Sequence, residues 1–401
     1  MAVSPPTPRA GAPLSRRLAE TESSPVRELL QIAMQPHIIS LAGGLPAPDT
    51  FDVPGLRDAF AEVLGGPDAT RALQYSTTEG DSALRDRLAA FMRRRGLPVA
   101  GDDLLITTGS QQALGLVAAA LLDPGDVVLV EDPTYLAALQ AFQLADLRPV
   151  AIPCDEHGPV PDALLEVAAA EGAKVAYLIP TFQNPTGRTM PAARRAAVAE
   201  AAAAAGLWLV EDDPYSALRL DGEDVDLLAA QPAARDRTIV VQTLSKVLSP
   251  GLRIGYMRAP AVLRGPLAVA KQAADLHTST VAQLAAERWL AAHDLGDHIA
   301  SLAAHYRPRR DALLEALEAH LPAGSRWTRP EGGLFIWVEL PSGFDAEAVL
   351  PRALERGVAY VPGRYFYAGE ARPETLRVSF ATATPDELRE GAARLAAALA
   401  G

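Results

Sequence analysis

One lysine of this chain stands in a segment suited to covalent chemistry. The chain has 37 basic residues, of which only three are lysines: Lys174, Lys246 and Lys271. A lysine taken out of water can lose its proton and form a Schiff base with a carbonyl compound, which arginine cannot do. Lys246 follows an apolar run at residues 238–241. Hydroxyl residues and one arginine accompany it: Thr243, Ser245 and Arg253. Lys246 is therefore a candidate nucleophile at a strand end.

A second segment has the composition of an anion site. The apolar run 104–106 is followed by Thr107-Thr108-Gly109-Ser110-Gln111. A strand, a glycine turn and a helix N-terminus in this order expose backbone amides, which suit a phosphate group. An ordinary serine N-cap would explain the same residues.

Aromatic and amide groups follow further apolar runs. Tyr135 comes after residues 127–130, where it could pack or support a planar ring. Asn184 begins Asn-Pro-Thr-Gly, a strong turn signal whose amide could also face a ligand. The pair Gly43-Gly44 is either a plain turn or a place where a ligand approaches the backbone.

Three adjacent carboxylates end the buried run 207–210: Glu211, Asp212 and Asp213, with Tyr215 two residues later. A strand that ends in acidic residues delivers them to the ligand edge of a sheet rather than to a solvated face. One carboxylate there could neutralise a buried cation, such as a protonated ring nitrogen.

These residues share a position in the expected architecture. Strand-like runs are 104–107, 127–131, 148–152, 175–180, 207–211, 238–244 and 254–258. Helical runs alternate with them at 53–64, 82–96, 110–122, 134–144, 161–171, 191–205 and 262–276. Because the strands are apolar throughout, the pattern predicts an α/β fold with a mainly parallel sheet covered on both faces. Ligands of such sheets collect at the carboxyl ends of the strands.

Composition narrows the class of protein. The chain has 401 residues and a formal charge of −12, which argues against a nucleic acid or an anionic membrane as partner. Its one cysteine, Cys154, allows no intrachain disulfide, and no Cys/His metal cluster is present in the sequence. No apolar run approaches the ~20 residues that span a bilayer, and no signal peptide is recognisable. We expect a soluble, cytoplasmic protein without a metal site.

Together the strand-end groups match the parts of one cofactor. An anion cradle, an aromatic platform, an acid for a ring nitrogen and a lysine for an aldehyde correspond to pyridoxal 5′-phosphate (PLP). The chain resembles the fold type I PLP-dependent aminotransferases of class I/II, in particular the 2-aminoadipate and kynurenine aminotransferase group. The motifs that carry the resemblance are SLAGGLP (40–46), ALQYS (72–76), TTGSQQAL (107–114), EDPTY (131–135), NPTG (184–187), EDDPY (211–215), TLSKVLSPGLRIGY (243–256), GGLFIW (332–337) and LRVSF (376–380).

The resemblance implies a role for each matching position. Lys246 would form the covalent aldimine with PLP and shuttle the proton, and Asp212 would pair with the ring nitrogen. Asn184 and Tyr215 would hydrogen-bond the phenolic oxygen, and Tyr135 would stack on the ring. The cofactor phosphate would be held by Ser110, Gln111, Thr243, Ser245 and Arg253.

The resemblance also implies partners and substrates. Tyr75 would reach the phosphate of a neighbouring subunit, which implies a homodimer with composite active sites. Arg377 would grip the substrate α-carboxylate with two parallel hydrogen bonds. Arg27 matches an arginine that meets a distal carboxylate, and Gly44 would line the same pocket, although Arg27 could equally be a surface charge. Acidic substrates such as glutamate and 2-aminoadipate, with 2-oxoglutarate as acceptor, are favoured, and hydrophobic or aromatic donors remain open.

The expected reaction is a ping-pong transamination between an L-amino acid and a 2-oxo acid. A PLP enzyme that catalyses elimination, decarboxylation or cyclisation would share the cofactor residues and is the alternative. A transcription regulator with an aminotransferase-like domain would need a DNA-binding domain ahead of residue 40, for which the sequence has no room.

The fold implied is that of aspartate aminotransferase. A seven-stranded sheet would lie in a large PLP-binding domain at residues 50–288, and a smaller α+β domain would occupy 289–401. The smaller domain would contain a helix at 299–321, strands at 335–340 and 376–380, and a terminal helix from Pro385. Residues 1–24 would form a flexible arm, with a helix start at Ser24 and Pro25. Residues 25–49 would pack with the small domain, and substrate binding could close the cleft between Lys246 and Arg377.

Overall fold

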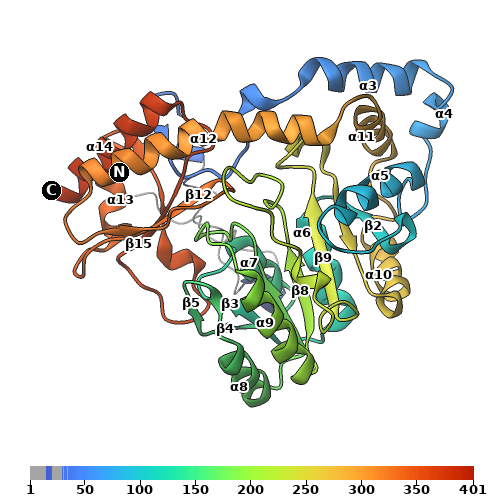
Figure 1. Ribbon diagram of the computed structural model, residues 1–401, viewed down its shortest axis with the longest axis horizontal. Helices are drawn as coiled ribbons and strands as arrows, with labels where there is room; N and C mark the ends of the chain where they lie inside the picture. Colours follow the sequence, from blue (N-terminus) through green and yellow to red (C-terminus); the bar gives the residue numbers. More distant parts are fainter. Residues whose placement is uncertain (1–14, 20–28, 30, 34) are drawn as a thin grey trace.

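A seven-stranded sheet forms the centre of the molecule, and a four-stranded sheet lies beside it (Figure 1). The computed structural model describes residues 15–19, 29, 31–33 and 35–401. Ser24, Pro25 and Arg27 lie outside these residues, as does most of the arm expected at 1–24. Within that arm, the short helix α1 (Arg16–Ala19) is described and lies against α7 (Leu136–Leu144).

The large sheet has the strand order β2-β10-β9-β8-β7-β3-β4. Its members are β2 (Leu104–Thr107), β3 (Val127–Glu131), β4 (Arg148–Ile152), β7 (Val175–Leu178), β8 (Trp208–Asp212), β9 (Thr238–Thr243) and β10 (Gly255–Arg258). Only β10 runs antiparallel to its neighbours, and the other pairs are parallel. The mainly parallel α/β sheet predicted from seven apolar runs is confirmed, with strand ends within two residues of prediction.

Helices cover both faces of this sheet, as the apolar strands require. They are α5 (Ser82–Arg93), α6 (Ser110–Leu121), α7, α8 (Pro161–Glu171), α9 (Ala192–Ala204) and α10 (Ala261–Ala274). Three further helices, α3 (Val53–Gly65), α4 (Ala69–Ala72) and α11 (Thr280–Ala292), pack on one another, and α11 also packs on α5. The helix expected at 82–96 ends three residues early, because the chain turns before Gly96, whose φ is +79°. The periodicity did not predict α11, which Ser279 caps by accepting a hydrogen bond from Ala282 N.

The second sheet is antiparallel and has the order β11-β12-β15-β14. Its strands are β11 (Arg326–Trp327), β12 (Phe335–Glu339), β14 (Val361–Pro362) and β15 (Thr375–Ser379). Three helices accompany it: α12 (Leu295–His320), α13 (Ala346–Glu355) and α14 (Pro385–Ala400). The helix expected at 299–321 begins at Leu295, because the Asp294 carboxylate accepts hydrogen bonds from the amides of Gly296 and Asp297.

A short N-terminal strand joins this second part of the molecule. β1 (Ile39–Ser40) pairs in parallel with β13 (Val358–Ala359), and Ser379 N donates to Leu41 O. Away from both sheets, β5 (Cys154–Asp155) and β6 (Gly158–Pro159) form a small hairpin. The pairing carries residues 41–44 past the carboxyl edge of the large sheet, where two of their carbonyl groups meet buried cations described below. The proposed domain boundaries stay predictions.

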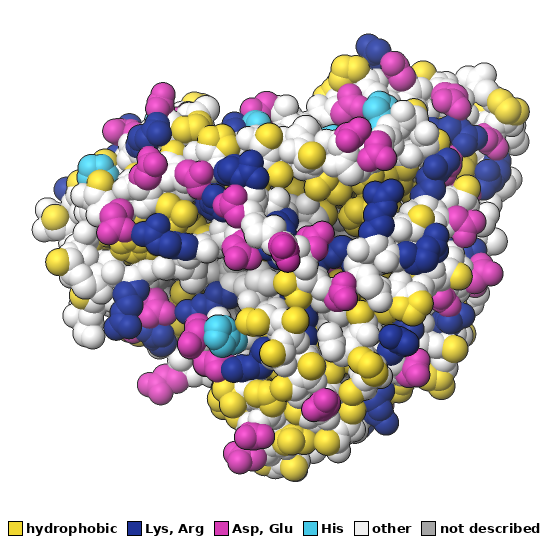
Figure 2. All heavy atoms as spheres, viewed as in Figure 1, with side chains coloured by type: hydrophobic (Ala, Val, Ile, Leu, Met, Phe, Trp, Pro, Cys, Tyr) yellow, Lys and Arg dark blue, Asp and Glu magenta, His cyan; other side chains and the backbone are white. Residues whose placement is uncertain are grey.

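The surface carries both signs of charge. On the face in Figure 2, lysine and arginine side chains are interspersed with aspartate and glutamate. None of the helices among the described residues is long and apolar enough to cross a membrane. The same residues contain no group of three His, Cys, Asp or Glu side chains arranged to hold a metal ion.

Candidate active site

A cavity of about 130 Å³ lies at the carboxyl ends of the central strands of the large sheet. It is lined by Ser110, Gln111, Tyr135, Ile179, Asn184, Asp212, Pro214, Tyr215, Thr243, Ser245, Lys246 and Arg253. All of these except Ile179 and Pro214 were predicted from the sequence as site residues. Segments that are far apart in the chain therefore meet at one edge, because parallel strands present their carboxyl ends together.

The turn between β2 and α6 forms a cradle at one end of the cavity. Gly109 has a φ of +75° and occupies the N-cap position, and no side chain caps the helix. The serine N-cap considered for Ser110 is therefore wrong: Ser110 is the first helical residue. A Cβ on Gly109 would collide with Nη2 of Arg253, and one on Gly255 would lie 2.7 Å from Ser110 N. Uncapped amides beside a guanidinium suit a phosphate group.

Two hydroxyl groups continue this cradle. Thr243 Oγ1 donates to Ser245 Oγ at 2.9 Å and lies 3.1 Å from both Ser245 N and Ile254 O. Gln111 also lines the cavity, and its side-chain Nε2 donates to Ala137 O at 3.0 Å. The cradle therefore consists of backbone amides, Ser110, Thr243, Ser245 and the guanidinium of Arg253.

The carboxylate of Asp212 faces the middle of the cavity. Its Oδ2 accepts a hydrogen bond of 2.6 Å from the hydroxyl of Tyr177. Its Oδ1 is buried without a hydrogen-bond partner. Burial raises the pKa of Asp212 to about 7, although the Tyr177 hydroxyl opposes the shift. A buried carboxylate oxygen with a free lone pair is the partner that a protonated ring nitrogen needs.

The two neighbouring carboxylates have structural partners. Glu211 points to the opposite face of β8 and accepts hydrogen bonds from the amides of Leu228 and Ala229. Asp213 accepts from Ser216 Oγ and Gln242 Nε2. Alternation along the strand therefore leaves only Asp212 directed into the cavity.

Lys246 stands opposite with few contacts. Its Nζ donates to the carbonyl oxygen of Gly44 at 2.8 Å and lies 5.8 Å from the centre of the Tyr215 ring. Burial lowers the pKa of the amine to about 8, and the positive charges of Arg377 and Arg253 act in the same direction. An amine with this pKa is partly neutral near pH 7 and can act as a nucleophile or a base.

Arg377 reaches the same region from the four-stranded sheet. Its Nη1 donates to Asn184 Oδ1 at 2.7 Å and its Nη2 to Ala42 O at 2.8 Å. The guanidinium lies over the ring of Phe335, 4.1 Å from its centre, and its Nε has no partner. Burial lowers the pKa of Arg377 to about 10. Arg377 and Lys246 therefore donate to carbonyl groups of the same short segment, at Ala42 and Gly44.

Tyr215 and Tyr135 complete the wall of the cavity. Tyr215 is buried and hydrogen-bonds Asn184, which links it to Arg377. Burial raises the pKa values of both tyrosines, so both phenols remain protonated at neutral pH. They can therefore donate hydrogen bonds to an oxyanion or pack flat against a ring.

Tyr75 lies away from the cavity of its own chain. Tyr75 is 80% exposed in this chain and meets His277 edge to face, with ring centres 5.8 Å apart. Arg27 is outside the described residues. Gly44 is beside the cavity, where a Cβ would lie 2.5 Å from Phe335 Cζ, so only glycine fits there.

The sequence alone did not indicate Tyr177, Phe335 or Phe366 as functional. Tyr177 sits inside an apolar strand, and only its hydrogen bond to Asp212 reveals a polar function. Phe335 and Phe366 pack on the Arg377 guanidinium at 4.1 and 4.9 Å. A tyrosine in the middle of an otherwise aliphatic run is the one signal that could have been used.

The residues present fit PLP. The cradle suits its phosphate, the free oxygen of Asp212 suits its ring nitrogen, and the amine of Lys246 suits its aldehyde. Asn184 and Tyr215 offer hydrogen-bond donors for its phenolic oxygen, and this match rests on the unpartnered Asp212 oxygen and the crowded glycines.

Comparison with known proteins agrees with this geometry. The chain is similar to aromatic-amino-acid aminotransferase 1 of Thermococcus litoralis, with 44% identity over 95% of this chain and 93% of the relative. It is 41% identical to 2-aminoadipate transaminase of Thermus thermophilus, over 95% and 94% of the two chains. Its fold matches the crystal structure of Pyrococcus horikoshii kynurenine aminotransferase in complex with PMP, with a TM-score of 0.91, 43% identity and 96% of each chain covered.

The family model for aminotransferase class I and II matches residues 36–395. The resemblance noted in the sequence and the aspartate aminotransferase-like fold are both confirmed. A PLP-dependent aminotransferase is thus supported by the family, by its relatives and by a cavity whose groups fit the cofactor. This chain belongs to the class I and II aminotransferases.

Proposed function

We propose that this enzyme transfers the amino group of 2-aminoadipate, glutamate or an aromatic L-amino acid to 2-oxoglutarate in two half-reactions. The observation that carries the proposal is the pairing of Lys246 and Arg377 through Gly44 and Ala42. This arrangement puts a weakly basic amine and a guanidinium at one end of the cavity, where an amino acid offers a C–H bond and a carboxylate.

Each residue has a distinct task in the proposed reaction. PLP, when bound, supplies an aldehyde that condenses with amines and a ring that stabilises negative charge on the attached carbon. Arg377 binds and orients the substrate carboxylate, and Asn184 holds that guanidinium in place. Lys246 would remove the proton from the substrate α-carbon and return it to the cofactor carbon that was the aldehyde. Asp212 keeps a positive charge on the ring nitrogen, with Tyr177 fixing its second oxygen.

The substrate classes are proposed from the relatives and from Arg27. Similar proteins carry the names aromatic-amino-acid, 2-aminoadipate and kynurenine aminotransferase. Arg27 would bind a distal carboxylate of the substrate. An aromatic substrate has no such carboxylate, so apolar contacts would hold its side chain instead. Acidic and aromatic amino acids would therefore bind at the same site and pass their amino group to the same 2-oxo acid, 2-oxoglutarate.

We also propose that the enzyme acts as a homodimer with composite sites. Tyr75 and Leu73 are 80% and 76% exposed on one segment, where a second copy of the chain would cover both side chains. Tyr75 would reach the phosphate cradle of a second copy. Sedimentation of the holoenzyme should give twice the mass of the chain, and a cytoplasmic location stays a prediction.

The test follows the bound cofactor directly. The holoenzyme is mixed with single L-amino acids, and the absorbance of the bound cofactor is recorded before and after 2-oxoglutarate is added. We expect 2-aminoadipate, glutamate and aromatic amino acids to change the spectrum and 2-oxoglutarate to restore it. A change that 2-oxoglutarate does not reverse, with release of ammonia or carbon dioxide, would show a different PLP reaction.

A further inference from the structure

Lys271 is a second buried lysine that the proposed reaction does not use. It lies on α10, and its side chain is fully buried. Its ammonium has three acceptors: Gln112 Oε1 at 2.8 Å, Asp275 Oδ1 at 2.7 Å and Thr278 Oγ1 at 3.1 Å. An ammonium has three N–H donors, so each one is satisfied. Arginine has a flat five-donor fork and cannot copy this tripod.

The acceptors of Lys271 also hold Thr108, which precedes Gly109 in the phosphate cradle. Gln112 Oε1 accepts from Thr108 N at 2.8 Å, and Asp275 Oδ2 accepts from Thr108 Oγ1 at 2.9 Å. Lys271 therefore acts on Thr108 through two shared acceptors. Gln112 links it to the backbone amide of Thr108, and Asp275 links it to the hydroxyl of Thr108. The position of Thr108 determines where the uncapped amides of Gly109 and Ser110 point.

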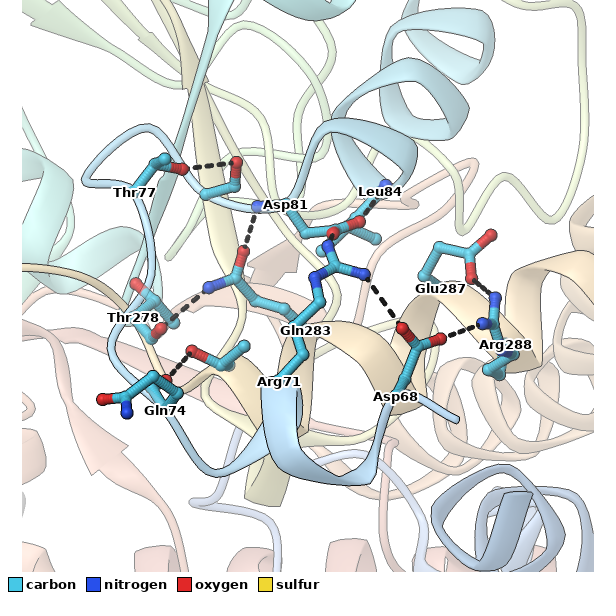
Figure 3. Close-up of polar contacts among 12 residues, drawn as sticks. Asp68, Arg71, Gln74, Thr77, Asp81, Leu84, Thr278, Gln283, Glu287 and Arg288 are labelled. Atoms are coloured by element: carbon cyan, nitrogen blue, oxygen red, sulfur yellow. Dashed lines mark hydrogen bonds and ion pairs between the residues drawn. The ribbon is translucent and has the colours of Figure 1, made fainter. Parts of the chain in front are cut away.

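The same cluster is connected to the segment that carries Tyr75. The carbonyl of Thr278 accepts from Gln283 Nε2 at 2.7 Å, and Gln283 Oε1 accepts from Asp81 N at 2.8 Å. Figure 3 shows the Gln283 amide between Thr278 and Asp81. Gln283 is itself fully buried, so each of these bonds is shielded from water.

Ion pairs stiffen this segment from its other side. The Asp81 carboxylate accepts from Leu84 N and pairs with Arg71, which also faces Asp68 (Figure 3). Asp68 in turn pairs with Arg288 of α11 at 2.7 Å. Between these anchors, Tyr75 leans against His277, the residue next to Thr278. The turn at Thr278 is therefore common to the cradle and to the Tyr75 segment.

We propose that Lys271 is a positioning residue for cofactor phosphate, acting through Thr108 on the cradle of its own subunit and through Thr278 on the segment that presents Tyr75. The first arm rests on the PLP site alone. The second arm also rests on the proposed homodimer, in which Tyr75 meets the phosphate of the other subunit. Lys271 thus couples the two sources of phosphate contacts without touching the cofactor itself.

The experiment compares PLP with pyridoxal, which lacks the phosphate. Apoenzyme is titrated with each compound, and binding is followed by absorbance and by quenching of tryptophan fluorescence. We expect Lys271→Met to weaken PLP by about tenfold, because a network of charge-assisted hydrogen bonds is lost, and to weaken pyridoxal by less than about twofold. Lys271→Arg should not restore the affinity for PLP, because it keeps the charge but not the geometry.

Lys174→Met is the matched control. Lys174 pairs with Asp126 on the surface and is half exposed, so the variant loses the same charge without touching the cradle. Its PLP and pyridoxal affinities should equal those of the unmodified protein. Equal weakening of PLP and pyridoxal by Lys271→Met, or no weakening of either, would overturn the proposal. If the unmodified enzyme bound both compounds alike, the PLP site itself would be in question instead.

Two further variants keep the proposal testable. Thr278→Val removes one acceptor of Lys271 and retains the backbone carbonyl, and it should weaken PLP selectively by about threefold. This variant carries the test if circular dichroism shows that Lys271→Met is unfolded. The double variant Lys271→Met with Tyr75→Phe tests the second arm. Its loss of PLP affinity should be smaller than the product of the single losses, whereas a simple product would disprove the link to Tyr75.

Discussion

The two buried lysines of this protein illustrate how surroundings separate a reactive amine from a positioning one. Lys246 has one hydrogen-bond acceptor, Gly44 O, and two cations, Arg377 and Arg253, among the groups that act on it. The side chain of Lys271 is also buried, but its amine has three acceptors, one of them the anion Asp275. Burial lowers the pKa of both amines; the Asp212 carboxylate opposes the shift for Lys246, and a hydrogen bond to Asp275 opposes it for Lys271.

The difference teaches that depth of burial does not make a lysine reactive. A charged amine is tolerated where every N–H has an acceptor and an anion is near. It becomes easy to deprotonate where it has a single acceptor and the effect of neighbouring cations outweighs that of the nearest anion, as Arg377 and Arg253 outweigh Asp212 at Lys246. Four changes to the protein or to the pH test this difference between the two lysines and their surroundings, beginning with the change of largest effect.

Removing Lys246 should abolish turnover, whereas removing Lys271 should lower the affinity for PLP and leave turnover nearly unchanged. Lys246→Ala should retain the fold but lose turnover by about 10⁴-fold or more, because nucleophile and base are lost together. Lys271→Met, assayed with saturating PLP, should keep kcat within about threefold. Steady-state kinetics with 2-oxoglutarate as acceptor measure both. Near-normal turnover of Lys246→Ala would reverse the assignment of the two lysines.

Replacing Arg377 by lysine should separate the guanidinium's geometry from its charge. The variant keeps a cation near Lys246 but loses the bonds to Asn184 and Ala42 and the flat contact with Phe335. We expect kcat/KM for L-amino acids to fall by about 10²-fold, since two directed hydrogen bonds to the carboxylate are lost. Arg372→Lys, on the surface beside Glu339 and Glu374, is the control and should change little. An unchanged kcat/KM for Arg377→Lys would exclude it from carboxylate binding.

The pH dependence of PLP capture should report the pKa of Lys246. Because that pKa is lowered to about 8, the neutral fraction of the amine rises about tenfold per pH unit below pH 8 and is complete above it. The initial rate at which apoenzyme captures PLP should follow this curve in stopped-flow absorbance and level off near pH 8. A rate that still rises towards pH 10 would show that the pKa of Lys246 is that of an ordinary lysine and is not lowered by its surroundings.

The Tyr177 hydroxyl should have a smaller effect through Asp212. Tyr177→Phe removes the hydrogen bond to Oδ2 and leaves burial to raise the pKa of Asp212 further. We expect kcat to fall by about tenfold, because the carboxylate is less often ionised and less well oriented. Tyr360→Phe is the control, because it also loses one buried hydrogen bond, to the Ala346 carbonyl. It should lose as much stability as Tyr177→Phe but keep its kcat. Equal kcat values for both variants would remove Tyr177 from the site.

Much of the fold could be predicted from local patterns. Continuous apolar runs predicted all seven strands of the large sheet, and the residue that caps α14, Thr384, precedes the expected Pro385. The exceptions have local causes: α12 begins early because Asp294 caps it, and α11 was missed because its small and polar residues show no clear apolar stripe. Boundaries depend on single hydrogen bonds, which periodicity does not register.

The candidate site was also largely predictable, because parallel strands place their carboxyl ends together whatever their order. Ten predicted residues line one cavity for that reason. The choice among Glu211, Asp212 and Asp213 was made from the family resemblance, and the structure explains it by the alternation of β8. Contacts across 193 and 335 residues, from Arg377 to Asn184 and Ala42, have no local signature at all.

The sequence by itself determined which chemistry is available: a scarce lysine, a carboxylate at a strand end, a glycine turn before a helix and two arginines. These are properties of residue type and short spacing. Only the tertiary structure decided which lysine is reactive, because pKa depends on the charges and acceptors within a few ångströms, and these come from distant segments. Lys246 and Lys271 are the same type of residue, and the fold gives the first amine one acceptor and the second amine three.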